Sequence, residues 1–207
     1  MAPLDELELD ALKELFNIGS GRSAKALSTM VSQPVELTIP EVHVLPSHAA
    51  IEKLKSKNLG LISAVSQKFK GDFNGHALLM FNRESGLVLV RKLLQDSVPL
   101  DDLSELEQDS LLEVGNIMLN SCFGTVINHL NSDIEVEMPR FEQGTINSIY
   151  SHTIKNDWSL YIELQLSLPE ENIVGHISFV MGIQSQQKFQ SGVKDYITGI
   201  HRVAASK

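Results

Sequence analysis

The sequence of 207 residues has few cysteines, few basic residues and no long apolar runs, and each shortage excludes some classes of protein. It contains one cysteine, Cys122, so no disulfide can form within the chain, which fits a reducing compartment. Basic residues number 17 against 26 acidic ones, and the formal charge of −9 argues against a nucleic-acid-binding protein. No apolar run approaches the roughly 20 residues of a membrane span, and the acidic N-terminus lacks the regions of a signal peptide. We therefore expect a cytoplasmic protein that binds neither nucleic acid nor membrane.

The single cysteine and the histidines offer little for catalysis. Cys122 falls in a helical run, where a lone cysteine is usually a packing residue rather than a nucleophile. None of the 7 histidines forms a His-x-x-x-His or Cys/His pattern, so the sequence predicts no metal site. His76 and His176 each follow a glycine at the start of an apolar strand, which favours a structural role.

What the sequence does have is an internal repeat. Residues 4–17 read LDELELDALKELFN, and residues 103–116 read LSELEQDSLLEVGN, 99 positions later. Further along, Gly75-His76 matches Gly175-His176 at an offset of 100, which implies one extra loop residue in the second half. The repeat covers approximately 4–96 and 103–200. The residues that match at the offset of 99 include Asp10 with Asp109, Glu14 with Glu113, Asn17 with Asn116, and Pro40 with Pro139.

The hydrophobic pattern predicts the same order of elements in each half, namely helix, three strands, helix. Pro40 falls inside a predicted strand, which argues for an edge position, a bulge or a break between two short strands, and the strand predicted over 134–142 contains Pro139. The predicted helices cover residues 5–31, 84–96, 104–130 and 184–200, with a short helix or turn at 47–58, and the predicted strands cover 35–45, 59–69, 76–82, 134–142, 158–168 and 175–182.

These elements predict an α+β fold in a single domain covering residues 1–207. Strands joined by short loops suit antiparallel pairing, and two halves of this kind are expected to share one sheet and one core about an internal pseudo-twofold axis. Because the repeat already supplies the twofold arrangement, we expect a monomer. Capping boxes are predicted at Asp5 with Glu8 and at Ser104 with Glu107. The predicted core face of the first helix consists of Leu12, Leu15, Phe16, Gly19, Ala26, Leu27 and Met30.

The repeated polar residues form a stripe along each helix. Asp10, Glu14 and Asn17 are spaced i, i+4 and i+7, which places them within about 60° of one another on a helical wheel. The stripe lies roughly opposite the predicted core face, so we expect it to face solvent and a partner. Surface helices often carry such residues without any function. Here the same types recur in order in both halves, and asparagine is a mediocre mid-helix residue, so we favour a functional site.

The chemistry of the stripe suits a phosphoryl group better than a metal or a general base. A metal site would need further carboxylates or a histidine one turn away, which neither copy has. Glu14 has a carboxylate for acid–base chemistry, but Asn17 cannot take a proton. A neutral amide both donates and accepts hydrogen bonds, so it can hold a water near phosphoryl oxygens that would repel a carboxylate. The glutamate one turn earlier can pair with a cation of the partner.

The motif Asp-x-x-x-Glu-x-x-Asn, followed by 22 residues and then proline, is present twice. It resembles the CheC-type phosphatases of bacterial chemotaxis, a group that includes CheX and FliY. The resemblance spans nearly the whole chain, and the duplicated order of helix, strands and helix is that of CheC itself.

The resemblance implies hydrolysis of the aspartyl-phosphate on a CheY-like response regulator. By this resemblance, the asparagines orient the attacking water and the glutamates pair with a lysine of the regulator. It also implies that Mg²⁺ is bound by the regulator, so this chain is expected to bind no cofactor. The residues implied as catalytic are Glu14, Asn17, Glu113 and Asn116, and those in supporting positions are Asp10, Pro40, Asp109 and Pro139.

The two copies differ at neighbouring positions, where Phe16 matches Gly115 and Gly21 matches Asn120. These differences leave room for the sites to differ in rate or partner. Two alternatives to a phosphatase remain open. One is a non-catalytic adaptor that binds a phosphorylated regulator or the CheD receptor deamidase. The other is a flagellar switch component resembling the FliM middle domain, a group that shares the fold but lacks the glutamate and the asparagine.

Overall fold

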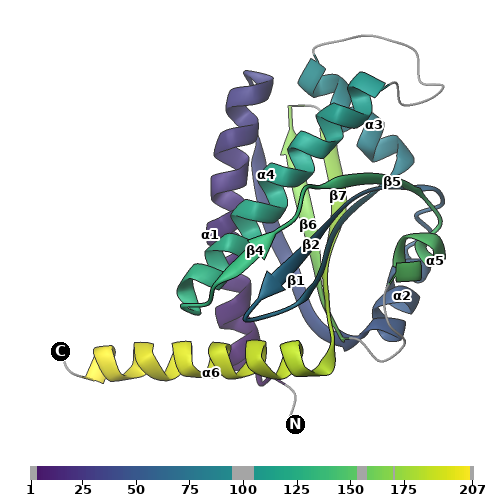
Figure 1. Ribbon diagram of the computed structural model, residues 1–207. Coiled ribbons are helices and arrows are strands. Elements are labelled where there is room, and N and C mark those ends of the chain that lie inside the picture. Colours follow the sequence, from purple (N-terminus) through teal and green to yellow (C-terminus); the bar gives the residue numbers. More distant parts are fainter. Residues whose placement is uncertain (1–3, 95–104, 153–157, 170, 206–207) are drawn as a thin grey trace.

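The computed structural model describes residues 4–94, 105–152, 158–169 and 171–205 (Figure 1). The helices are α1 (Glu6–Val31), α2 (Ser47–Ser56), α3 (Arg83–Leu94), α4 (Glu105–His129), α5 (Ile146–Ile149) and α6 (Ile183–Ala205), with a 3₁₀ turn, η1, at Tyr150–His152. The strands are β1 (Glu36–Pro46), β2 (Ile62–Gly71), β3 (Gly75–Asn82), β4 (Ile134–Val136), β5 (Arg140–Gly144), β6 (Trp158–Leu168) and β7 (Glu171–Met181).

The strands form one antiparallel sheet in the order β1-β6-β7-β3-β2-β4, with β5 also paired to β2. β2 and β3 form a hairpin, as do β6 and β7. The first strand of each half does not join the hairpin of its own half: β1 pairs with β6, and β4 and β5 pair with β2. Each half therefore completes the sheet of the other, which the sequence did not predict.

The predicted pseudo-twofold axis is confirmed by residues that face their own repeat partners. In the β3–β7 ladder Leu78 lies directly opposite Ser178, its counterpart at an offset of 100. Between the helices, the Ser23 hydroxyl contacts the thiol of Cys122, its counterpart at an offset of 99, at 4.0 Å. Only residues on a twofold axis can meet their own symmetry mates in this way. The two halves are pseudo-symmetric and share one sheet, as predicted.

Helices cover both faces of the sheet. α1 and α4 cross one face side by side, while α2 and α5 lie against the other, and α6 runs across one end (Figure 1). The larger core cluster fills the space under α1 and α4 and draws apolar residues from both halves. A smaller cluster lies between the opposite face and the short helices. Both polar stripes therefore lie on the pair of helices that cover the same face.

The predicted core face of α1 is right for its first half and wrong near its end. Ala26 is only partly buried and Met30 is 39% exposed, while Ser20, Ser23 and Ala24 face inward instead. Small residues are needed on this side because α4 packs closely against it. At Gly19 a Cβ atom would lie 2.6 Å from the carbonyl oxygen of Ser121 and 2.7 Å from Cα of Cys122, so no side chain fits there.

The two long helices begin and end as their sequences indicate. The Asp5 carboxylate accepts from the Glu8 backbone N–H at 2.9 Å and the Glu8 carboxylate from the Asp5 N–H at 2.8 Å, so the first capping box is confirmed. Ser104, which was predicted to begin the second, lies outside the described residues. Among the described residues, α4 alone is long and apolar enough to cross a membrane, and 56% of that window is buried. Its packing against both the sheet and α1 accounts for this apolar character.

The two motif prolines interrupt their strands differently. Pro40 lies in β1, an edge strand, and the pairing of β1 with β6 shifts register between Thr38 and Glu41. Pro139 falls in the gap between β4 and β5, so the single strand predicted over 134–142 is wrong. Proline has no N–H to donate to a ladder, so each strand must bulge or stop where proline occurs. In the first repeat the strand bulges near Pro40, and in the second repeat the strand stops before Pro139.

Candidate functional site

In the first copy of the motif, the side chains of Asp10 and Glu14 are exposed on α1 and Asn17 is half-buried. The Asn17 side-chain oxygen, Oδ1, accepts a hydrogen bond from the backbone N–H of Ile39 at 3.0 Å. A backbone N–H can only donate, so the amide end facing it is the oxygen. Ile39 directly precedes Pro40, and the structure thus brings the motif asparagine next to the strand segment that carries the motif proline.

A second contact fastens this part of α1 to β1. The Ser20 hydroxyl lies 2.8 Å from the Asn17 carbonyl and 3.1 Å from the carbonyl of Leu37, and both are within donating distance. Leu37 and Ile39 are buried, so β1 packs against α1 on both sides of Thr38. The first asparagine therefore lies against a continuous strand.

In the second copy the motif residues lie around a hollow of about 410 Å³. The carboxylates of Asp109 and Glu113 are exposed, and Asn116 is half-buried. The hollow brings together all the predicted residues of this copy with several that were not predicted. Its lining consists of Asp109, Glu113, Asn116 and Pro139 from the motif, together with Gln67, Leu112, Asn120, Val136, Glu137 and Met138.

The Asn116 amide is held by two other amides. Its Oδ1 accepts from Nε2 of Gln67 on β2 at 3.1 Å and from Nδ2 of Asn120, one turn further along α4, at 2.7 Å. In both copies, then, the asparagine oxygen faces donors of this protein. What remains for a partner is the Nδ2 amino group, which can only donate.

The strand segment beside the second asparagine differs from the first. The residue before Pro139 is Met138, the counterpart of Ile39, and it is 85% exposed whereas Ile39 is 2% exposed. Because β4 ends at Val136 and β5 begins at Arg140, the chain leaves the sheet between them. The first copy is thus closed by its strand, and the second opens into the hollow.

Among the described residues, no group of three or more histidine, cysteine, aspartate or glutamate side chains could hold a metal ion. The carboxylates of each stripe are separated by helical turns rather than gathered on one point. The lack of a cofactor in this chain remains a prediction, as does the Mg²⁺ of a partner.

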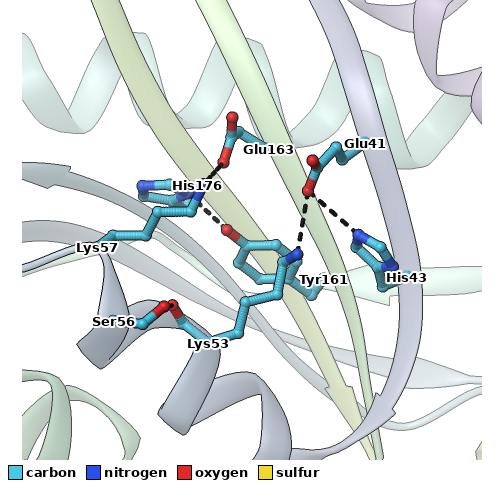
Figure 2. Close-up of polar contacts among 8 residues, drawn as sticks. All are labelled: Glu41, His43, Lys53, Ser56, Lys57, Tyr161, Glu163 and His176. Carbon is cyan, nitrogen blue, oxygen red and sulfur yellow. Dashed lines mark hydrogen bonds and ion pairs between the residues drawn. The ribbon is translucent and has the colours of Figure 1, made fainter.

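A second polar cluster lies on the opposite face of the sheet, between β1, β6, β7 and α2 (Figure 2). Its charges are matched in pairs. Glu41 on β1 bonds to His43 at 3.2 Å and to Lys53 of α2 at 3.1 Å, and Lys57 bonds to Glu163 on β6 at 2.7 Å. The bond from Lys53 lowers the pKa of the Glu41 carboxyl. The bond to Glu163 raises the pKa of the Lys57 amine. Such pairing fastens α2 to the sheet and leaves no charge unmatched for a reaction.

His176 is the buried part of this cluster. Its Nδ1 lies 2.9 Å from the Tyr161 hydroxyl, and the Lys53 ammonium lies 5.6 Å from the centre of the Tyr161 ring. Burial lowers the pKa of His176 to about 4, so the ring is neutral near pH 7. This placement agrees with the structural role expected for His176.

Cys122 is a packing residue. It is fully buried where α1 and α4 cross, and burial raises its pKa to about 12. A thiol that stays protonated and out of contact with solvent cannot act as a nucleophile near neutral pH.

Several curated proteins resemble the sequence, and three of them are described below. The flagellar motor switch phosphatase FliY of Bacillus subtilis is 28% identical over 141 residues, 67% of this chain and 36% of that protein. The CheY-P phosphatase CheC of Bacillus subtilis is 22% identical over 121 residues, 57% of either chain. The putative CheY-P phosphatase CheC1 of Halobacterium salinarum is 23% identical over 181 residues, 84% of this chain and 90% of that protein. The matched part is thus between about a third and nine tenths of these relatives. No family model matches the chain.

Solved structures share the fold. Thermotoga maritima FliY matches with a TM-score of 0.74 at 18% identity, over 93% of this chain and 98% of the other. The FliM middle domain of H. pylori matches with a TM-score of 0.67 at 13% identity, over 91% and 99%. CheX, in a crystal structure of a CheX–CheY–BeF₃–Mg²⁺ complex from Borrelia burgdorferi, matches with a TM-score of 0.52 at 19% identity, over 81% and 96%.

The fold is shared with Thermotoga maritima FliY and with the FliM middle domain of H. pylori. By its sequence relatives this chain is similar to the CheC/CheX/FliY family of chemotaxis phosphatases, and its fold agrees with that similarity. The expected resemblance is thereby confirmed at the level of the family.

The sequence did not reveal Gln67 or Met138 as parts of a site. Gln67 precedes Asn116 by 49 residues and lies in a strand of the other half. The sequence did contain one sign of a role for Gln67: it is a polar residue between Val65 and Phe69, on the face of β2 that alternation predicts to be buried. Met138 gave no signal, because an exposed methionine looks like any other residue of an apolar strand.

Proposed function

We propose that this chain accelerates hydrolysis of the aspartyl-phosphate of a CheY-like response regulator at two helix-borne sites, Glu14 with Asn17 and Glu113 with Asn116. Water attacks the phosphorus, the aspartyl carboxylate leaves, and inorganic phosphate is released. The observation that carries the proposal is the pair of half-buried asparagines, each one turn after an exposed glutamate and each next to a motif proline segment.

The asparagines have the right chemistry for the partner's reacting group. With the oxygen of each amide bonded to donors of this protein, the amino group is available to a phosphoryl oxygen or to the attacking water. An N–H donor stabilises the negative charge that a carboxylate at the same position would repel. Asparagine cannot activate the water as a base, so its contribution is orientation of the reacting groups.

The glutamates supply recognition. Glu14 and Glu113 are exposed one turn before the asparagines and can pair with an ammonium group of the regulator. The relatives' names include CheY-P phosphatases, and the Borrelia burgdorferi structure holds CheX with CheY, BeF₃ and Mg²⁺. We propose on this basis that the metal is carried by the regulator and that this chain completes the site from outside.

A double variant tests the proposal. A CheY-like regulator is phosphorylated with a small-molecule donor, the donor is removed, and phosphate loss is followed with and without the protein. The wild-type protein is expected to accelerate the loss, and Asn17→Ala with Asn116→Ala is expected to return it to the regulator's own rate. The fold and regulator binding should be kept, because neither alanine removes a core residue.

The matched control is Asn128→Ala, an exposed asparagine near the end of α4, which is expected to keep full activity. If wild-type protein gives no acceleration at stoichiometric concentration, the phosphatase proposal is wrong. Full activity of the double variant would instead show that another site carries the reaction.

Two other functions are distinguished by the same preparation. An adaptor would bind the phosphorylated regulator, or a CheD deamidase, without changing the rate of phosphate loss. A switch component would share the fold of the FliM middle domain, which matches here at 13% identity, and would need neither asparagine. The presence of both complete stripes favours the phosphatase.

A further inference from the structure

Gln67 is a buried polar residue on a face of β2 that otherwise carries core side chains. It is 3% exposed, and its neighbours on that face, Val65 and Phe69, are 1% exposed. Burying an amide without hydrogen bonds costs about 1–3 kcal/mol, so a glutamine is retained at such a position only where its polar group is used. Its Nε2 donates to Oδ1 of Asn116 at 3.1 Å.

The core itself does not require a glutamine here. β6 is related to β2 by the repeat, since each is the first strand of a hairpin whose second strand carries the Gly-His pair. On the same face of the sheet β6 carries Ile162, Leu164 and Leu166, all buried in the larger cluster. An apolar side chain therefore packs at this level of the sheet in the other half.

The helix is built to bring Asn116 within reach of Gln67. Gly115 precedes Asn116, and a Cβ atom there would lie 2.6 Å from the Val65 side chain. The counterpart of Gly115 is Phe16, whose ring instead fills space against Phe179 at 5.8 Å between centroids. Because Gly115 has no side chain, α4 can approach β2 at Val65. Asn116, the next residue of the helix, then meets Gln67, which lies two residues beyond Val65 on the strand.

Two donors converge on one oxygen. The Asn120 amino group donates to the same Oδ1 at 2.7 Å, and the first half has Gly21 at this position, which has no side chain to donate. A carbonyl oxygen has two lone pairs, and both are used. The amide can then present only its amino group to the hollow.

We infer that Gln67, although it belongs to the first half of the chain, is a positioning residue of the second site: together with Asn120 it fixes the Asn116 amide so that Nδ2 rather than Oδ1 meets the phosphoryl group. This inference rests on the proposed function. Without the hydrogen bonds from Gln67 and Asn120, the Asn116 amide can rotate and present its oxygen, which phosphoryl oxygens repel. Because Gln67 is only 3% exposed, it acts on the rate through Asn116 rather than by contact with the regulator.

The test uses Gln67→Met in an Asn17→Ala background, where the second site alone can act. Methionine is unbranched and of similar length but donates no hydrogen bond, and it suits an apolar core. The rate at saturating phosphorylated regulator, kcat, is expected to fall about tenfold, while the half-saturating concentration changes less than twofold, because orientation and not contact is lost. Asn120→Ala should give a smaller loss of the same kind.

A control and a second readout separate positioning from folding. Gln165→Met, at an exposed glutamine on β6, should leave both constants unchanged. In the free protein, the side-chain amide signals of Asn116 in ¹H–¹⁵N spectra should shift on Gln67→Met, while the backbone signals of β6 and β7 stay in place. A variant that merely unfolds would lose the whole spectrum.

Each outcome decides something different. If wild-type protein has no phosphatase activity, the proposed function fails, and this inference fails with it. If the Asn17→Ala protein is active and Gln67→Met leaves its kcat unchanged, the inference alone is overturned. If the Asn17→Ala protein is inactive while the Asn116→Ala protein is active, the second site does no chemistry, and the inference is again wrong while the proposed function stands.

Discussion

Amide side chains carry the polar chemistry of both sites, and each is held by a different kind of donor. Asn17 is oriented by a backbone N–H that cannot be changed by substitution of Ile39, because it belongs to the strand itself. Asn116 is oriented by the side chains of Gln67 and Asn120, each of which can be replaced singly. At the scale of single residues the first site is therefore fixed by the fold, and the second by a set of replaceable contacts.

The buried His176 gives a prediction about pH. Its pKa is lowered to about 4 by burial, against an ordinary value of about 6.5 in the unfolded chain. The unfolded state therefore binds more protons between these values, and the contribution to stability, present above pH 6.5, is lost as pH falls towards 4. At about 1.4 kcal/mol for each pKa unit, the loss amounts to about 3 kcal/mol.

Urea unfolding at pH 7, 5.5 and 4.5 measures this contribution. His176→Asn keeps an acceptor for the Tyr161 hydroxyl but cannot be protonated, so its stability should fall less steeply with acid than that of the wild type. The control is His48→Asn, at an exposed position of α2, which should follow the wild type. Parallel curves for wild type and His176→Asn would contradict the prediction.

At the scale of elements, the break between β4 and β5 distinguishes the two sites. Where β1 runs on through its bulge, the second half stops and exposes Met138, and Val136 beside it is 42% exposed. Leu106, in the first turn of α4, is 64% exposed. Exposed apolar side chains beside a polar site are typical of surfaces that receive a partner.

Met138 is therefore expected to contribute to binding of the regulator at the second site. In an Asn17→Ala background, Met138→Ser should raise the Kd for a BeF₃-loaded CheY-like regulator about tenfold, which corresponds to about 1.4 kcal/mol of lost apolar contact. Isothermal titration calorimetry measures it. Val174→Ser, at a 42% exposed valine of β7, is the matched control and should bind as before. Equal Kd values for the two variants would argue against a role for Met138.

The elements predicted from the sequence were those with strong periodicity. The alternation over 158–168 predicted β6 with the bounds it has, and the helices of 26 and 25 residues, α1 and α4, were recognised from their apolar stripes and the first capping box. The strand over 134–142 was wrong because the pattern of apolar residues continues through Pro139, where the backbone cannot. Periodicity reports which side of an element is buried, and it does not report where a ladder must stop.

The candidate site was predictable in part for a related reason. The positions of the stripe on each helix follow from spacing alone, and the structure places their carboxylates in solvent. The contact of Asn116 with Gln67 depends on which strand lies under α4. Because β2 pairs with strands of the other half, no pattern local to either residue contains that information.

At the scale of the whole molecule, each half gives its first strand to the hairpin of the other. A separated half would leave that strand and the edge of its own hairpin unpaired, and exposed edges of this kind pair with other chains. Fragments 1–98 and 99–207, expressed together, should therefore assemble one to one with the circular dichroism spectrum of the intact chain. Expressed alone, neither should be a folded monomer.

Copurification through a tag on one fragment, followed by size-exclusion chromatography with light scattering, checks this expectation. A mixture of tagged and untagged intact chains is the control and should not exchange. Either fragment eluting alone as a stable folded monomer would show that the exchange of strands is not needed for folding.

The pseudo-twofold axis has a consequence for how the two sites came to differ. In a dimer of identical subunits a single gene encodes both sites, so every substitution appears in both. Once both copies are encoded in tandem, selection acts on them separately, and Gly21 and Asn120, or Phe16 and Gly115, are free to diverge while the motif is kept. The chain thus keeps a twofold arrangement of its main elements, while the strand segments and the side chains around its two asparagines differ.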